Sequence, residues 1–147
     1  MKHKKTVHIM LLVIRIILGI IFFAHGMQKF NMGMDAVTQM FDGVGIPLAG
    51  FFAWIVTLLE TFGGVALIVG VGVRIVSLLL AVVMFVGVIV KWQFGLISVG
   101  NGAGFELDLA LIAALLPLLV YGAGKFSLLA FRKSEIQDPT EMPRQMI

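Results

Sequence analysis

Charged residues are absent from three long stretches of the sequence, at residues 43–59, 75–90 and 109–124. Each stretch reaches the roughly 20 apolar residues of a membrane-spanning helix once its neighbours are included. A fourth apolar run lies near the start of the chain and carries one internal charge, Arg15. The pattern predicts four spans, at about 7–29, 50–70, 74–92 and 105–122.

A soluble four-helix bundle is the competing interpretation, and it would give every helix an apolar stripe and a polar back. Residues 75–90, IVSLLLAVVMFVGVIV, contain one polar side chain, Ser77, and therefore have no polar back. Apolar residues make up 60% of the chain and charged residues 13%, against about 45–50% and 25% in soluble domains. The sequence therefore predicts an all-α integral membrane four-transmembrane-helix bundle with the lipid bilayer as its solvent.

Basic residues are distributed unequally between the two sides that four spans create. The side holding both termini carries eight of them and the other side two, Lys29 and Lys91. The positive-inside rule then predicts cytoplasmic termini in a multi-pass protein of the cell membrane. We expect a basic N-terminus at 1–6, a membrane domain at 7–128 and a disordered polar tail at 129–147, with outer loops at about 30–49 and 93–104.

Several kinds of chemistry have no support in the sequence. The absence of cysteine excludes disulfides, thiol redox chemistry and cysteine-ligated clusters in this chain. His3 and His8 lie roughly 25 Å along the first helix from His25, so we predict no metal site within a subunit. The net charge of +3 does not indicate a nucleic-acid partner, because the basic residues are sorted by membrane side.

Two ionisable residues, Arg15 and Glu60, fall well inside the predicted spans. Each would cost about 3 kcal/mol at the centre of the bilayer if unpaired. Counted at 1.5 Å per residue, Arg15 lies roughly 12 Å from the inner boundary and Glu60 roughly 15 Å from the outer one, which are similar depths in a core about 30 Å thick. We expect a buried Arg15–Glu60 ion pair, which either locks the bundle together or handles protons.

A second group of polar residues is predicted at the outer ends of three helices. We expect these side chains to converge on one outer mouth and to bind substrate there: His25, Gln28, Lys29, Lys91, Asn101 and Glu106. The alternative is that the lysines reach for lipid head groups and that Glu106 and Asp108 favour the positive end of a helix dipole.

A possible internal repeat is left open by the sequence. RIILGII at residue 15 and RIVSLLL at residue 74 begin alike, and each run continues to a lysine, Lys29 or Lys91. The match is short and the two spacings differ.

Four segments in a fixed order carry a family resemblance: GMQKF, LLETFGGVALIVGVGVR, NGAGFELDLALIAALL and GAGKFSL. In this order, over roughly residues 10–130, the chain resembles the DoxX family of four-helix bacterial and archaeal membrane proteins. The resemblance implies that Gly26-x-x-Lys29, Glu60 before Gly63 and Gly64, and the segment 101–106 are characteristic positions. The usual pattern is nearer NGGxE, so GAG shifts Glu106 by one residue, and Leu129 replaces a common Asp.

The family name traces to a subunit of a thiosulfate:quinone oxidoreductase. The resemblance therefore implies an oxidoreductase component linked to quinone or small aromatic redox chemistry, with no redox cofactor bound covalently. The electrons would then come from a partner redox subunit, and homo-oligomers are possible assemblies. Two other functions remain open from the residues: a small-solute or proton-coupled transporter with Glu60 as its coupling site, and a membrane assembly factor.

Overall fold

The computed structural model describes residues 2–97 and 104–124, and the predicted tail at 129–147 lies outside this range. In the described residues the chain is helical and forms no strand. The elements are α1 (Lys2–Met32), α2 (Met34–Gly43), α3 (Ala49–Val69), α4 (Val73–Lys91), the short 3-10 helix η1 (Trp92–Phe94) and α5 (Glu106–Tyr121).

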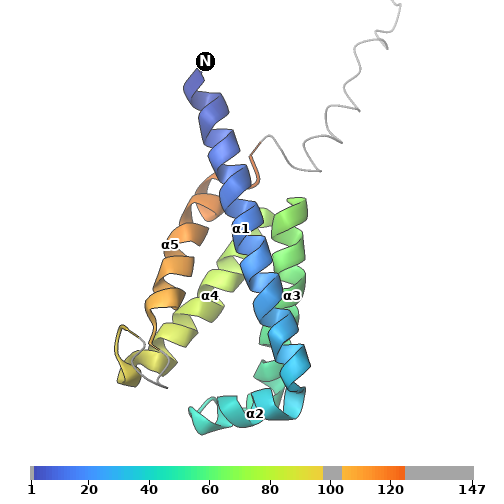
Figure 1. Cartoon of the computed structure of the whole chain (residues 1–147), viewed down its shortest axis with the longest axis vertical. Coiled ribbons are helices and arrows are strands. Elements are labelled where there is room, and N and C mark those ends of the chain that lie inside the picture. Colours follow the sequence, from blue (N-terminus) through green and yellow to red (C-terminus); the bar gives the residue numbers. More distant parts are fainter. Residues whose placement is uncertain (1, 98–103, 125–147) are drawn as a thin grey trace, which may run out of the picture.

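Four helices, α1, α3, α4 and α5, run lengthwise in alternating directions (Figure 1). Helix α2 lies across one end of these four helices. The short helix η1 lies at the same end, which we call the α2 end. The start of α1, the turn between α3 and α4 and the end of α5 lie at the opposite, N-terminal end. Most helix contacts join α1 to α3 and α4 to α5, so the bundle consists of two antiparallel pairs.

Three helices are long and apolar enough to cross a membrane, at Thr6–Met32, Ala49–Val69 and Val73–Phe94. The last two match the predicted spans at 50–70 and 74–92 closely. Helix α5 occupies the position of the predicted fourth span, but its 16 residues extend only about 24 Å, less than the roughly 30 Å of the hydrocarbon core. Its crossing of the bilayer stays a prediction, as does the side on which the termini lie.

The outward surface of the bundle is apolar. Large side chains such as Ile20, Phe62 and Ile75 are exposed along the spanning helices. Lipid contact satisfies such side chains, whereas in water a surface of this kind would drive aggregation. The four long helices share one buried apolar cluster: Leu11, Leu18, Phe22, Leu67, Val73, Leu80, Met84, Leu111, Leu115 and Leu118.

Helix α2 replaces part of the loop that was expected at residues 30–49. Its fully buried Val37 and its exposed Asp35 lie on opposite sides of a short amphipathic helix, and Thr38 packs near Gly50 at the start of α3. A single buried position in ten residues gives too weak a periodic signal to predict a helix. A tight turn follows α2: the amide of Gly45, at φ +79°, donates to the carbonyl oxygen of Asp42.

Glycines set the register of the α1–α3 pair. A Cβ atom added at Gly64 would lie 2.5 Å from the backbone nitrogen of Phe23 and 2.6 Å from the carbonyl oxygen of Gly19. One added at Gly26 would clash with Thr61. Small residues at both contacts let the two backbones approach closely, as is common between helices in membranes. Gly19 is therefore level with Ile68, Phe23 with Gly64 and Gly26 with Thr61.

Candidate functional site

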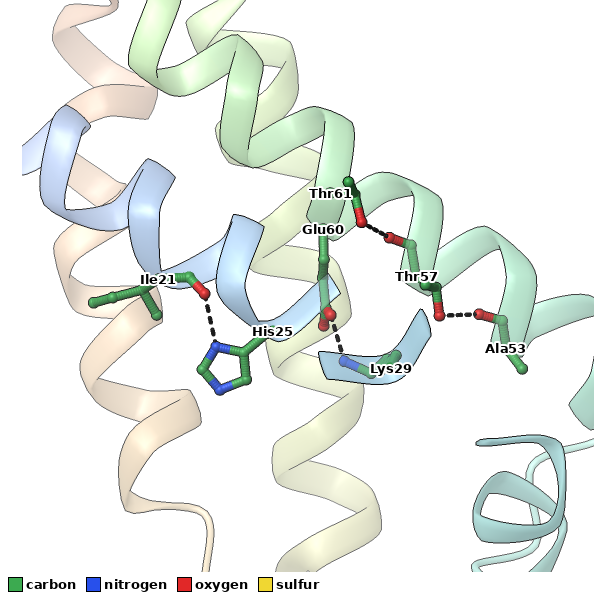
Figure 2. Close-up of polar contacts among 7 residues, drawn as sticks. All are labelled: Ile21, His25, Lys29, Ala53, Thr57, Glu60 and Thr61. Carbon is green, nitrogen blue, oxygen red and sulfur yellow. Dashed lines mark hydrogen bonds and ion pairs between the residues drawn. The ribbon is translucent and has the colours of Figure 1, made fainter. Parts of the chain in front are cut away.

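The most deeply buried ion pair of the described chain joins Lys29 in the last turn of α1 to Glu60 of α3. The Lys29 ammonium contacts Oε2 of Glu60, and the two side chains are 15% and 3% exposed (Figure 2). Glu60 is the twelfth of the 21 residues of α3, so its carboxylate lies inside an apolar span. An ionised carboxylate at this depth requires a partner such as this lysine.

The predicted ion pair between Arg15 and Glu60 is wrong. Arg15 precedes Gly19 by four residues, and the glycine register therefore places it level with Gly72, beyond the last residue of α3 and about 18 Å along the helix axis from Glu60. The predicted depths of the two residues were counted from assumed helix ends. The register of α1 against α3 is set instead by the close contacts of the glycines, so those depths did not predict which residues meet. Arg15 is buried, and its Nη1 donates to the carbonyl oxygen of Ala123 at 2.9 Å.

Two threonines flank Glu60 on α3 and hydrogen-bond within their own helix. The Thr57 hydroxyl donates to the carbonyl oxygen of Ala53 at 2.7 Å, and the Thr61 hydroxyl donates to that of Thr57 at 2.8 Å (Figure 2). Each hydroxyl has a single proton, so neither can also donate to a ligand. The donors available beside Glu60 are therefore the N–H groups of Lys29.

His25 lies one turn before Lys29 on α1, and Figure 2 shows both side chains in the same region as the Glu60 carboxylate. Nδ1 of His25 lies 2.8 Å from the carbonyl oxygen of Ile21. A carbonyl only accepts, so Nδ1 carries the proton in this contact. His25 is half-buried, whereas Gln28 of the predicted set is exposed on α1.

A second ion pair joins α4 to α5 at the α2 end. Nζ of Lys91 donates to Oδ2 of Asp108 at 2.8 Å, with the side chains 33% and 7% exposed. The sequence predicted Asp108 near the outer mouth, with attraction to the helix dipole as the alternative, but it did not predict this pairing with Lys91. The signal that could have found it is that the two residues lie at facing ends of consecutive predicted spans.

In the described residues, the two lysines of the predicted outer mouth belong to two separate ion pairs. Lys29 and Lys91 belong to different helix pairs and bind different carboxylates. Glu106 is half-buried at the start of α5, where its backbone amide donates to the carbonyl oxygen of Leu96 at 2.9 Å. Asn101 lies outside the described residues. Within residues 2–97 and 104–124, no group of three or more acidic or histidine side chains comes together to hold a metal ion.

Two arginines hold the end of α5 at the N-terminal end of the bundle. Arg15 of α1 binds the carbonyl oxygen of Ala123, and Nη2 of Arg74 of α4 donates to that of Val120 at 3.1 Å. Cations at the carboxyl end of a helix are favoured by its dipole and satisfy carbonyl groups that the helix leaves open. Arg15 therefore ties the first helix to the last, a contact across 108 residues that no sequence pattern indicates.

Comparisons with known proteins agree with the resemblance seen in the sequence. The DoxX family profile matches residues 10–92, which include both residues of the Lys29–Glu60 pair. A Bacillus subtilis (strain 168) protein named "Putative oxidoreductase CatD" is 34% identical over 120 residues, covering 82% of this chain and 84% of that protein. The "Uncharacterized membrane protein Rv3486" of Mycobacterium tuberculosis is 30% identical over 125 residues, covering 78% and 76%.

No solved structure matches the chain. The family profile nevertheless covers more than half of the sequence, and both relatives align with most of it. The apolar helices, the order of the motifs and these matches lead to one conclusion: this membrane protein belongs to the DoxX family.

Proposed function

We propose that this protein is the membrane component of a quinone-linked oxidoreductase system and that it binds the head group of a quinone, or a related small aromatic, at the Lys29–Glu60 pair. The proposal includes α5 as a fourth span and both termini on the cytoplasmic side of the cell membrane. The observation that carries it is the buried Lys29–Glu60 ion pair inside the apolar bundle.

The chemistry of the pair suits an apolar ligand with hydrogen-bond-accepting oxygens. An ammonium group has three N–H donors, and Glu60 occupies one of those on Lys29. A quinone carbonyl can accept from another without separating the pair. Lys29 is the more exposed partner, so the ligand would approach from its side, while Glu60 remains buried against Thr57 and Thr61.

The reaction balances only with an external source of electrons. A quinone takes up two electrons and two protons to become a quinol, and the described residues offer no redox centre. The electrons would come from a reduced donor on a partner subunit. The pair's contribution is to fix the head group and to pass one of the two protons from Lys29 to a quinone oxygen, while water supplies the second proton and re-protonates Lys29.

A relative's name supports this class of function. The Bacillus subtilis relative that aligns over 120 residues carries the name "Putative oxidoreductase CatD". The alignment covers 82% of this chain and 84% of that protein, so it concerns most of both chains.

Trp54 offers a direct test, because its ring lies 6.2 Å from that of Phe30, the residue after Lys29. The chain has two tryptophans, and Trp92→Phe leaves Trp54 as the single reporter. We expect decylubiquinone to quench Trp54 saturably in nanodiscs. Glu60→Gln and Lys29→Gln should each weaken this binding about tenfold, whereas Asp35→Asn on exposed α2 should not. Absence of a saturable signal, or equal signals in all variants, would exclude quinone binding at the pair.

A proton-coupled transporter is the second candidate, and the same buried pair favours it, since intramembrane carboxylates commonly serve as coupling sites. The two functions separate in proteoliposomes containing a pH-sensitive dye. Proton flux that Glu60→Gln abolishes, together with no saturable quenching of Trp54, would favour transport. Loss of a co-purifying protein in the same variant, with neither flux nor quinone binding, would favour an assembly role.

A further inference from the structure

The α4–α5 pair repeats the set of groups found at Lys29–Glu60. In each case a lysine near the α2 end of one helix pairs with a carboxylate of the next antiparallel span, Glu60 or Asp108. A glycine lies on the lysine-bearing helix one turn earlier, Gly26 or Gly87. The repeat that the sequence left open thus has a counterpart in the side-chain contacts.

The second glycine makes room for the second carboxylate. A Cβ atom added at Gly87 would lie 3.0 Å from Oδ1 of Asp108 and 3.3 Å from its carboxyl carbon. A larger residue at this position would therefore push the carboxylate away from α4 and from Lys91. The close approach lets Asp108 remain 7% exposed while it binds the lysine.

The residue after each lysine also belongs to a pair of aromatic rings. Phe30 follows Lys29 and meets Trp54 edge to face. Trp92 follows Lys91 and stacks on Phe105, with ring centroids 5.3 Å apart and an interplanar angle of 11°. Phe105 is buried and Trp92 is 69% exposed, so one face of the indole is covered and the other is open.

The second site is the more accessible of the two. Lys91 is 33% exposed against 15% for Lys29, and Asp108 lies in the first turn of α5, whereas Glu60 lies in the middle of α3. Lys91 keeps N–H groups left to donate, and Trp92, the next residue, offers an open indole face; together they suit a planar ring bearing an accepting oxygen.

We infer that Lys91, Asp108 and Trp92 form a second, outer binding site for the same class of ligand, a quinone or small aromatic head group. This site would receive the ligand at the α2 end before it reaches Lys29. The inference takes its ligand class from the proposed function, but it concerns different residues and a different reporter.

The two tryptophans allow each site to be measured without the other. In a Trp54→Phe protein in nanodiscs, decylubiquinone should quench Trp92 saturably, and Asp108→Asn or Lys91→Gln should weaken this binding about tenfold. Gly87→Ala should weaken it several-fold. In the Trp92→Phe protein, none of these three changes should alter the affinity reported by Trp54 more than about twofold.

The outcomes separate the two proposals. Saturable quenching of Trp54 with only non-saturable quenching of Trp92 would overturn the second site and leave the proposed function standing. Saturable quenching of Trp92 alone would overturn binding at Lys29–Glu60. Asp108→Asn keeps the shape of the side chain but removes the negative charge that binds Lys91, so unchanged Trp92 quenching in a folded Asp108→Asn protein would also overturn the inference.

Discussion

Gly19 of α1 and Gly64 of α3 face each other with no room for a side chain on either. A Cβ atom at Gly19 would lie 2.7 Å from the carbonyl oxygen of Gly64, and one at Gly64 would lie 2.6 Å from that of Gly19. The obstacles are backbone atoms, which cannot move aside as the end of a flexible side chain can. This contact fixes the register that brings Lys29 to Glu60.

Gly64→Ala should therefore destabilise the protein by about 1–3 kcal/mol, the usual cost of overpacking a tight contact. Gly43→Ala is the matched control. It adds the same methyl group where nothing lies within 4 Å, so it should change stability little. Unfolding midpoints in mild detergent, measured by circular dichroism, would compare the two. Equal midpoints would show that the α1–α3 contact is looser than described.

The Lys29–Glu60 pair should behave as a coupled unit. Lys29→Met leaves a carboxylate in the apolar span without its partner, and removal of one member of a buried pair costs about 3–5 kcal/mol. The double variant Lys29→Met with Glu60→Gln removes the unpaired charge and should recover at least about 1 kcal/mol of that loss. A double variant less stable than Lys29→Met would contradict the pairing.

Much of this fold follows from the sequence because a helix that crosses lipid requires a long run of residues with few or no charges. Runs without charge predicted the spans at 50–70 and 74–92 to within a residue or two of α3 and α4. The short amphipathic α2 was missed, since its one fully buried residue, Val37, leaves little periodicity to detect.

The candidate site was predicted in its residues but not in its pairings. Lys29 and Glu60 were both singled out, yet Glu60 was assigned to Arg15. Partner choice depends on how far two helices slide past each other, and the contacts of Gly19 and Gly26 decide this. Composition and spacing within one helix carry no information about that shift.

Arg15 should matter for the last helix more than Arg74 does. Arg15 is buried and binds the carbonyl oxygen of Ala123, whereas the contact of Arg74 with Val120 is exposed and screened by solvent. Arg15→Met should speed hydrogen exchange of the Gly122 amide, which donates to the carbonyl oxygen of Leu118, by about tenfold. Arg74→Met should change that rate less, and the reverse order would show that the buried contact does not hold α5.

The absence of native cysteine makes topology directly measurable with single introduced thiols. Gln39 is exposed on α2, and Val71 is exposed in the turn between α3 and α4 at the opposite end. The excess of basic residues predicts that this turn faces the cytoplasm. In intact cells, an impermeant maleimide should label Gln39→Cys and should label Val71→Cys only after permeabilisation. The opposite pattern would invert the orientation.

Helix α5 can be tested for crossing in the same way, at the exposed positions Leu107 and Tyr121 near its two ends. Its length of about 24 Å is short for the bilayer, but modest thinning of the lipid around it costs only fractions of a kcal/mol per Å. The ion pair of Asp108 with Lys91 also ties its first turn to the end of a full-length span. We therefore expect Leu107→Cys to react from outside the cell and Tyr121→Cys only from within. Labelling of both from one side would mean that α5 does not cross, and the protein would then have three spans and termini on opposite sides.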